Sequence, residues 1–232
     1  KNKIDCKMIP LEVKKDYLKK LLGYLKKDPK FLGGAVTVPY KENIYNYLGK
    51  NVDKLTKKIG SVNCLYKENT LKGINTDGIG FYETLKKNEI KKSFSKILLL
   101  GYGGVGKAAL VYLRKYFSKK TKVYCTTRKN FSKKIKKLGC YWIKWNKKDI
   151  SLDSFNMIVN STSIGFGKMK DKTPCSLPKK SKIKIIYDII YNPKNTLLIK
   201  NSKKLKIRTI NGLDMNFLQA QFAIKQVFKN KI

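Results

Sequence analysis

Residues 96–117 read KILLLGYGGVGKAALVYLRKYF, and this stretch decides the fold. Its apolar start, 96–101, predicts a buried strand, and its end, 107–117, predicts a helix. The glycines between them follow the Gly-x-Gly-x-x-Gly spacing, which an ordinary glycine-rich turn lacks. In this motif the first glycine permits a tight turn, the second admits a pyrophosphate, and the third lets helix and strand pack closely. The predicted cofactor-binding residues of the loop are Gly101, Gly103, Gly104, Val105 and Gly106.

The end of the next predicted strand, 122–127, indicates which dinucleotide binds. An NAD site usually has an acidic residue there, which bonds the ribose 2′-hydroxyl. This chain has Thr127, Arg128 and Lys129 instead, with no acid. Arg128 can pair with a 2′-phosphate and Lys129 adds charge. We therefore predict NADP (NADPH) as the cofactor; the alternative is that these two cations are only surface charge.

Strand and helix patterns alternate along the chain, which favours an α/β architecture with two closely joined lobes. Strands are predicted at 35–38, 61–66, 71–75, 96–101, 122–127, 155–162, 184–191 and 206–211. Helices are predicted at 11–27, 41–48, 77–86, 107–117, 131–139, 198–205 and 214–228.

The composition limits the classes of function. The 232 residues carry a net charge of +38, which suggests either binding to nucleic acid or an anionic membrane, or lysines spread over a solvated surface. Lysines occur in every segment, which favours the second interpretation and predicts no nucleic-acid partner. No apolar run approaches the length of a membrane span. The five cysteines form no CxxC pair, so we expect reduced thiols, a cytoplasmic protein and no metal site.

Seven stretches, in this order along residues 4–228, together resemble the shikimate dehydrogenase family. They are VTVPYK (36–41), VNCLY (62–66), INTDGIGF (74–81), LLGYGGVGKAAL (99–110), IVNSTSIG (158–165), YDIIYNP (187–193) and NGLDM…Q (211–219). The resemblance implies NADPH-dependent reduction of 3-dehydroshikimate to shikimate, in the biosynthesis of aromatic amino acids. It also implies an α/β substrate-binding lobe over residues 1–78, with the helix in 213–232 packing back on it, and a doubly wound Rossmann lobe that binds NADP over 79–212.

The resemblance also implies roles for individual residues. The catalytic pair corresponds to Lys41 and Asp77. The substrate-binding positions correspond to Thr37, Asn63, Asp77, Tyr191 and Gln219. Beside the glycine loop, the cofactor positions correspond to Thr127, Arg128, Lys129, Ile189 and Gly212. A homodimer is compatible with the sequence, which does not determine the oligomeric state.

The chain contains no histidine, so proton transfer falls to Lys, Asp, Glu, Tyr or Cys. Lys41 follows Pro39 at the start of a predicted helix, whose dipole disfavours the ammonium form, while a nearby Asp77 would favour it. We expect Lys41 to give the proton to the substrate oxygen and Asp77 to orient Lys41. Taken alone, Lys41 would be interpreted as a solvated helix residue and Asp77 as a simple N-cap. The two motifs together with the glycine loop favour the catalytic interpretation.

Some alternatives stay open at this level. Asn63 and Gln219 can bind hydroxyls or form polar packing, and Tyr191 can contact the substrate or close the core. Members of the family begin with a strand and a Ser-x-Ser stretch that binds the substrate carboxylate, and no such stretch precedes Lys1. The chain is therefore expected to be N-terminally truncated relative to the family. Enzymes that also use quinate, and a non-catalytic homologue, remain alternative functions.

Overall fold

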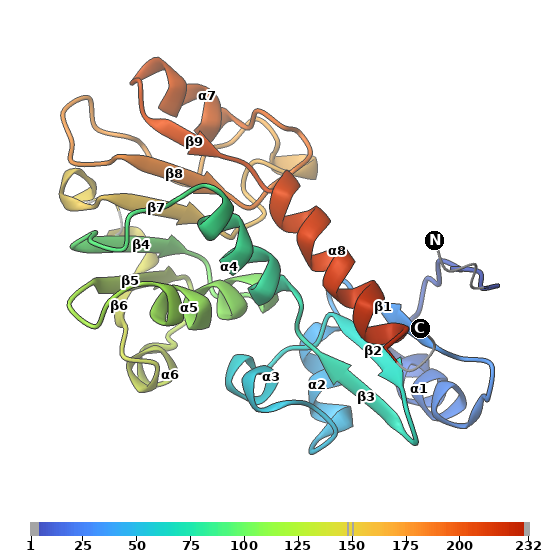
Figure 1. The fold of residues 1–232 in the computed structure, drawn as a ribbon. Helices are drawn as coiled ribbons and strands as arrows, with labels where there is room; N and C mark the ends of the chain where they lie inside the picture. The colour runs from blue at the N-terminus through green and yellow to red at the C-terminus, as the bar shows by residue number, and fades with distance from the viewer. Residues whose placement is uncertain (1–4, 148, 150, 230–232) are drawn as a thin grey trace. The chain divides into compact units, whose positions relative to one another are not determined.

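The computed structural model describes residues 5–147, 149 and 151–229, and the chain divides into two units. The first contains the residues up to Thr76 together with those from Ala220 onward, and the second runs from Asp77 to Gln219. The first has a small antiparallel sheet and the second a six-stranded parallel sheet (Figure 1). The α/β fold predicted from the sequence is confirmed.

The second unit contains the parallel sheet and the helices that cover it. Its strands are β4 (Lys96–Leu100), β5 (Lys122–Thr127), β6 (Tyr141–Lys144), β7 (Met157–Asn160), β8 (Ile185–Asp188) and β9 (Arg208–Ile210). Their order is β6-β5-β4-β7-β8-β9, and every neighbouring pair is parallel. The chain therefore starts at β4 and adds β5 and β6 on one side of it. It then returns to place β7, β8 and β9 on the other side. This reversal defines a doubly wound sheet, which binds its ligand outside the carboxyl ends of the strands.

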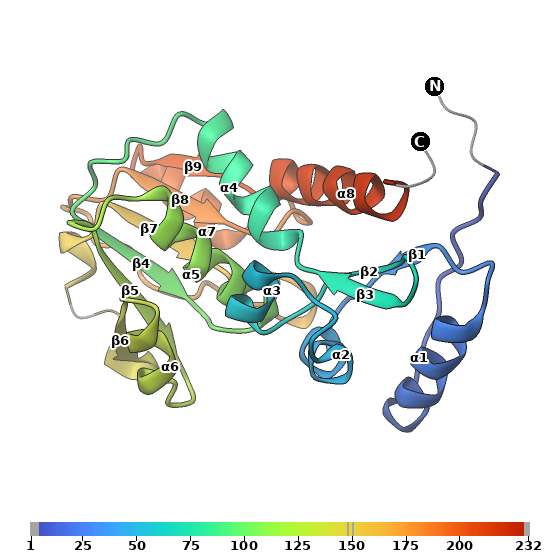
Figure 2. The same ribbon diagram turned by 60° about the horizontal axis from the view of Figure 1, so that its bottom comes forward.

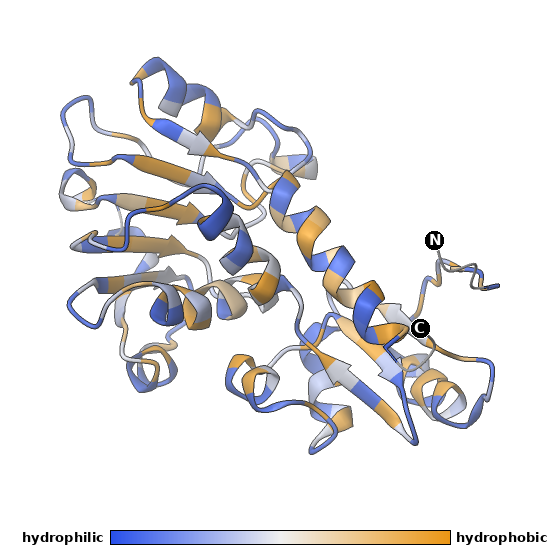
Figure 3. Cartoon of the chain, in the orientation of Figure 1, coloured by the Kyte–Doolittle hydropathy of each residue, from blue (hydrophilic) through white to orange (hydrophobic). Residues whose placement is uncertain are grey.

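Both faces of this sheet are buried, as expected for a parallel sheet. Its central strands are hydrophobic along their length (Figure 3). On one face, α4 (Asp77–Lys87) and α5 (Gly104–Tyr116) pack side by side (Figures 1 and 2). The ring of Phe81 in α4 stacks on Tyr187 of β8, with centroids 5.1 Å apart. The sheet is thus held to its helices by large buried side chains.

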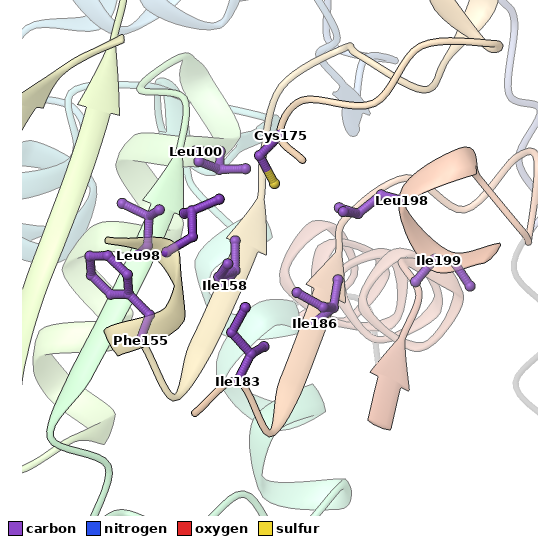
Figure 4. Close-up of a cluster of buried hydrophobic side chains, with 10 residues drawn as sticks. Leu98, Leu100, Phe155, Ile158, Cys175, Ile183, Ile186, Leu198 and Ile199 are labelled. Carbon is purple, nitrogen blue, oxygen red and sulfur yellow. The ribbon is translucent and has the colours of Figure 1, made fainter. Parts of the chain in front are cut away.

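The opposite face has its own apolar cluster, to which α7 (Leu197–Lys204) contributes (Figure 4). The cluster consists of Leu98, Leu100, Leu152, Phe155, Ile158, Cys175, Ile183, Ile186, Leu198 and Ile199. Alternate residues of β4 point into it, because successive side chains of a strand face opposite sides. The short helix α6 (Ser132–Lys137) follows β5. Among the described residues, 3-10 turns are found at Lys15–Tyr17, Trp145–Lys147, Leu152–Ser154 and Gly167–Met169.

The first unit has three antiparallel strands in the order β1-β2-β3: Gly33–Ala35, Cys64–Lys67 and Leu71–Ile74. Its helices are α1 (Leu18–Lys27), α2 (Lys41–Leu48) and α3 (Lys54–Ile59). A second apolar cluster joins α1 and α2 to the sheet and consists of Leu18, Leu22, Ile44, Leu48, Val52, Val62, Leu65 and Leu71.

Three predicted elements in this unit have wrong boundaries. The strand predicted at 61–66 begins only at Cys64. The strand predicted at 35–38 lies at Gly33–Ala35, because the chain turns at Thr37 and Val38 is exposed. The helix predicted at 11–27 begins only at Leu18. The segment before it takes another course, and the hydroxyl of Tyr40 donates a hydrogen bond to the Val13 carbonyl there.

The last helix, α8 (Leu213–Val227), has its C-terminal part in the first unit. A Cβ atom at Gly33 would lie 2.6 Å from a methyl group of Val227, so β1 has no room for a side chain there. The Cys64 thiol of β2 lies 3.9 Å from the Ala223 carbonyl oxygen. The C-terminal helix therefore packs back on the small sheet, as predicted. In the part of the chain that is described, no helix is long and apolar enough to span a membrane.

Candidate functional site

The glycine loop joins the end of β4 to the start of α5. Gly101 has a φ of +99°, which favours glycine. A Cβ at Gly106 would lie 2.6 Å from the Gly101 carbonyl oxygen and 2.7 Å from the Ser161 hydroxyl. A Cβ at Gly103, in contrast, would meet nothing within 4 Å. The loop is thus closed toward the sheet at Gly106 and open at Gly103, where α5 begins.

This geometry fits the pyrophosphate of a dinucleotide. The backbone can approach a phosphate at the open side of Gly103, and the N-terminus of a 13-residue helix attracts negative charge. The loop also lies beside β7, at the point where the strand order reverses. The five predicted loop residues, Gly101, Gly103, Gly104, Val105 and Gly106, are all brought together here.

The predicted cofactor-selecting residues follow the next strand. Thr127 is the buried last residue of β5, and Arg128 and Lys129 after it are exposed. The Thr127 hydroxyl donates to the Lys129 carbonyl and accepts a hydrogen bond from the Trp142 indole at 2.8 Å. The indole N–H of Trp142 therefore helps to hold this turn. The two exposed cations thus lie within a hydrogen-bonded turn.

An aromatic pair links this turn to the glycine loop. The rings of Tyr102, inside the loop, and Phe131, after the turn, have centroids 5.3 Å apart. The ammonium group of Lys107 lies 5.8 Å from the centroid of the Tyr102 ring. Sequence reasoning missed this pair, although an aromatic residue at the variable second position of a glycine motif is an available signal.

Ile189, Tyr191 and Gly212 lie at the other half of the carboxyl edge. Ile189 follows β8, and its backbone N–H donates to the Asn160 carbonyl at 3.0 Å. A Cβ at Gly212 would lie 1.8 Å from the Ile189 carbonyl oxygen, so only glycine fits there. These two predicted cofactor residues are therefore in direct backbone contact, while the Tyr191 side chain is exposed.

Buried polar side chains meet at the same edge, and sequence reasoning missed their connection. The Asp188 carboxylate, at the end of β8, accepts hydrogen bonds from Thr196 at 2.6 Å and from Asn160 at 3.0 Å. Its pKa is raised above the ordinary value because burial penalises the charged form, although these hydrogen bonds oppose the shift. The available signal was an aspartate inside the otherwise apolar run IIYDII (185–190).

In the first unit, Lys41 is the first residue of α2 and its side chain is buried, with 9% exposure. The Val62 N–H donates to the Lys41 carbonyl at 2.9 Å, which ties the start of α2 to the segment before β2. Thr37 lies in the turn just before α2 and is exposed.

Two buried asparagines hold the segment that leads to Asp77. Asn63 exchanges hydrogen bonds with Thr76, donating to its hydroxyl at 2.9 Å and accepting from its N–H at 2.7 Å. The Asn75 amide donates to the carbonyl and the hydroxyl of Ser61, both at 3.0 Å. The predicted substrate residue Asn63 thus also has a structural task, and the backbone position of Thr76 is fixed.

Asp77 and Gln219 belong to the second unit. Asp77 is the first residue of α4 and is 6% exposed. A Cβ at Gly80 of α4 would lie 2.8 Å from Cβ of Gln219, so α4 and α8 are in close contact there. Within the described residues, no group of three Cys, Asp or Glu side chains could hold a metal ion.

Comparisons with known proteins agree with this arrangement. A family model described as the shikimate dehydrogenase substrate binding domain matches residues 1–65. The shikimate dehydrogenase (NADP(+)) of Nitrosopumilus maritimus is 34% identical over 224 residues, which cover 94% of this chain and 80% of that protein.

Solved structures give the same result. A chorismate mutase/shikimate 5-dehydrogenase fusion protein from Clostridium acetobutylicum superposes with a TM-score of 0.82 at 29% identity, over 94% of this chain and 79% of that one. The shikimate 5-dehydrogenase of Thermus thermophilus, in complex with NADP(H) and shikimate, gives 0.75 at 26% identity, over 91% and 79%.

The doubly wound sheet and its glycine loop are typical of a dinucleotide-binding α/β protein. With these relatives, the assignment becomes narrower: the chain belongs to the shikimate dehydrogenase family.

Proposed function

We propose that the protein reduces 3-dehydroshikimate to shikimate with NADPH. The observation that supports this proposal is the presence, in one chain, of a glycine loop that is open at Gly103 and a buried lysine at the start of α2. Two relatives that are 34% and 36% identical to this chain are named shikimate dehydrogenase (NADP(+)), which supports the choice of reaction.

The cofactor is proposed to be NADP. The glycine loop of residues 101–106 would hold its pyrophosphate, and Arg128 and Lys129 would pair with the 2′-phosphate, which an acidic residue would repel. Thr127 would fix their turn, and Ile189 and Gly212 would support the nicotinamide end. When bound, the reduced nicotinamide supplies the hydride.

The chain's own residues supply the proton for the reacting carbonyl and orient the substrate. Lys41 donates a proton to the oxygen of the reacting carbonyl as it becomes an alcohol. Asp77 orients the Lys41 ammonium group and accepts a hydrogen bond from a substrate hydroxyl. Thr37, Asn63, Tyr191 and Gln219 bind further polar groups of the substrate, since hydroxyls and amides can both donate and accept.

The test follows NADPH absorbance with 3-dehydroshikimate, and NADP reduction with shikimate and with quinate. Turnover of 3-dehydroshikimate and shikimate, with quinate much slower, is the expected result. Comparable quinate oxidation would replace the proposal with a broader specificity. A folded protein that binds NADPH but converts none of the three would show a non-catalytic homologue.

The role of Lys41 is tested by Lys41→Ala, with Lys54→Ala as the matched control. Lys54 is the exposed first residue of α3 in the same unit. Lys41→Ala should lower kcat by about 100- to 10,000-fold, the usual range for a lost acid or base, with little change in NADPH affinity. Turnover near that of the Lys54→Ala protein would refute the assignment.

A further inference from the structure

Four polar side chains form one network at the carboxyl ends of β7 and β8: Asn160, Thr162, Asp188 and Thr196. Asn160 and Asp188 are fully buried and are register partners as the last residues of their strands. The amide of Asn160 donates to Asp188 at 3.0 Å, and its oxygen accepts from the hydroxyl and the N–H of Thr162 at 2.7 and 3.0 Å. The Thr196 hydroxyl completes the network by donating to the other Asp188 oxygen at 2.6 Å.

The network connects three separate segments of the second unit. Asn160 and Thr162 fix the turn after β7, where the Asn160 amide also donates to the Ile164 carbonyl at 3.2 Å. Asp188 accepts the Ile190 N–H at 3.2 Å in the loop after β8. Thr196 caps α7 by accepting the Ile199 N–H. Burying this carboxylate costs free energy unless it is hydrogen-bonded, and its three hydrogen bonds tie the end of β7, the loop after β8 and the start of α7 to one another.

That geometry concerns the backbone of Ile189 and Ile190. On one side, the Ile189 N–H donates to the Asn160 carbonyl at 3.0 Å, and Ile190 is held by Asp188. On the other side, Gly212 donates its N–H to the Ile190 carbonyl at 3.1 Å. Gly212 also packs so closely on the Ile189 carbonyl that a Cβ atom at position 212 would not fit. The two residues are therefore held from both sides, at the edge of the sheet.

The position of this segment gives it a chemical meaning. In a doubly wound sheet, the two halves each take one nucleotide outside the carboxyl ends of the strands. The glycine loop after β4 and the turn after β5 belong to the half for the adenosine phosphate. The segment after β8 belongs to the other half, where the nicotinamide ring of a bound dinucleotide would lie.

We propose that Asp188 is a positioning residue for hydride transfer: through Asn160, Thr196 and the Ile190 amide, it fixes the backbone against which the nicotinamide rests. Asp188 is too buried to touch a ligand and acts only through its partners. The proposal rests on the proposed dinucleotide cofactor and deepens it, because it assigns a residue that controls one end of that ligand.

The test compares two ligands by calorimetry: NADP⁺, and 2′-phospho-ADP-ribose, which lacks only the nicotinamide. Thr196→Val removes the hydroxyl whose hydrogen bond Asp188 accepts, and Thr196→Ser keeps a hydroxyl at this position. Asp188→Asn is the second variant, because it leaves the Thr196 cap of α7 in place. The control is Ser202→Ala, which removes another fully buried hydroxyl of α7, the one that donates to the Leu198 carbonyl at 2.7 Å.

Thr196→Val should weaken NADP⁺ binding by about tenfold, the scale of one lost hydrogen bond to a charged group, and leave 2′-phospho-ADP-ribose binding within about twofold. Asp188→Asn should act in the same direction, and Thr196→Ser and Ser202→Ala should resemble the wild type. Retained binding of the fragment shows at the same time that each variant is folded. Equal weakening of both ligands, or no weakening of either, would overturn the proposal.

A second measurement uses NADPH deuterated at the transferred hydrogen. Thr196→Val should lower kcat and raise the isotope effect on it, since a misplaced nicotinamide makes hydride transfer slower than other steps. A lower kcat with an unchanged isotope effect would indicate only a smaller folded fraction. If the wild type binds NADP⁺ but converts no 3-dehydroshikimate, the proposed reaction fails and the binding comparison still decides the role of Asp188. If it binds no dinucleotide, both fail.

Discussion

The two units hold their candidate functional residues by different means. In the second unit, the glycine loop is shaped by the absence of side chains, because backbone and hydroxyl groups occupy the space next to Gly106. In the first, the segment leading to Asp77 is held by the side-chain amides of Asn63 and Asn75. Adding side-chain atoms should therefore disrupt the glycine loop. Removing side-chain atoms should disrupt the segment that leads to Asp77.

Adding atoms to the glycine loop should have the largest effect. Gly106→Val places a side chain against the Gly101 carbonyl, which must shift and open the loop. Overpacking of this kind costs about 1–3 kcal/mol or more, so dinucleotide affinity should fall by about 100-fold. Calorimetry with NADP⁺ measures this affinity, and Gly23→Ala is the control, because it adds a Cβ in α1 of the first unit, where no atom lies within 4 Å of it. Wild-type affinity in Gly106→Val would contradict the closed side of the loop.

Removing atoms from the first unit should lower stability. Asn75→Ala loses both hydrogen bonds to Ser61 in a buried place and should reduce the free energy of unfolding by about 1–3 kcal/mol. Asn46→Ala, at an exposed position of α2, should change it by less than about 0.5 kcal/mol. Urea denaturation of the two variants makes the comparison. If Asn46→Ala lowered the free energy of unfolding as much as Asn75→Ala, the stabilising role proposed for the Asn75 amide would be contradicted.

The third change tests charge rather than shape. Arg128→Ala should raise the Michaelis constant for NADPH by about tenfold, since a bond between charged groups is lost, and should hardly alter that for NADH. Lys133→Ala, in the nearby α6, removes the same charge from an exposed side chain and should affect neither. An equal effect of Arg128→Ala on both cofactors would show that Arg128 does not distinguish them.

The smallest expected effect is a pH dependence that arises from Asp188. Burial raises the pKa of this carboxyl in the folded protein, so the folded chain keeps its proton to higher pH than the unfolded chain does. Its contribution to stability therefore decreases as the pH rises from about 4 through the raised pKa, and is constant above it. Its hydrogen-bond partners, Thr196, Asn160 and the Ile190 amide, do not titrate.

Chemical denaturation of the wild type and of Asp188→Asn, at a series of pH values from weakly acidic to neutral, measures this contribution. The free energy of unfolding of the wild type minus that of the variant should fall with increasing pH, because the other ionisable groups are common to both proteins. A difference that rises with pH would show a pKa below the ordinary value.

The sequence predicted the second unit better than the first, for physical reasons. KILLLG and KVYCTT are continuous apolar or β-branched runs of buried parallel strands, and the observed strands Lys96–Leu100 and Lys122–Thr127 fall within them. Near Ala35, the pattern alternates as in a strand, but the chain turns at Thr37, before Pro39. At Leu11, the apolar spacing suits a helix, yet that residue is exposed and the helix begins at Leu18.

The site shows the same limit. A motif such as Gly-x-Gly-x-x-Gly is local, so its loop is readable from neighbouring residues. The bonds of Asp188 depend on the register of β8 against β7 and on the loop that returns to Thr196, and no local pattern specifies these. The indole of Trp142 reaches Thr127 only because β6 pairs with β5. The functional roles of Lys41, Asp77 and the remaining site residues stay predictions.

The pairing of Asn160 with Asp188 also bears on how the sheet selects its alignment. If β8 slid by two residues along β7, every apolar side chain would remain on its own face, so hydrophobic burial alone does not forbid the shift. The shift would, however, take the Asp188 carboxylate away from the Asn160 amide and leave a buried charge short of a donor, which is unfavourable. One polar pair at the ends of two apolar strands therefore distinguishes the native alignment from an otherwise equivalent one.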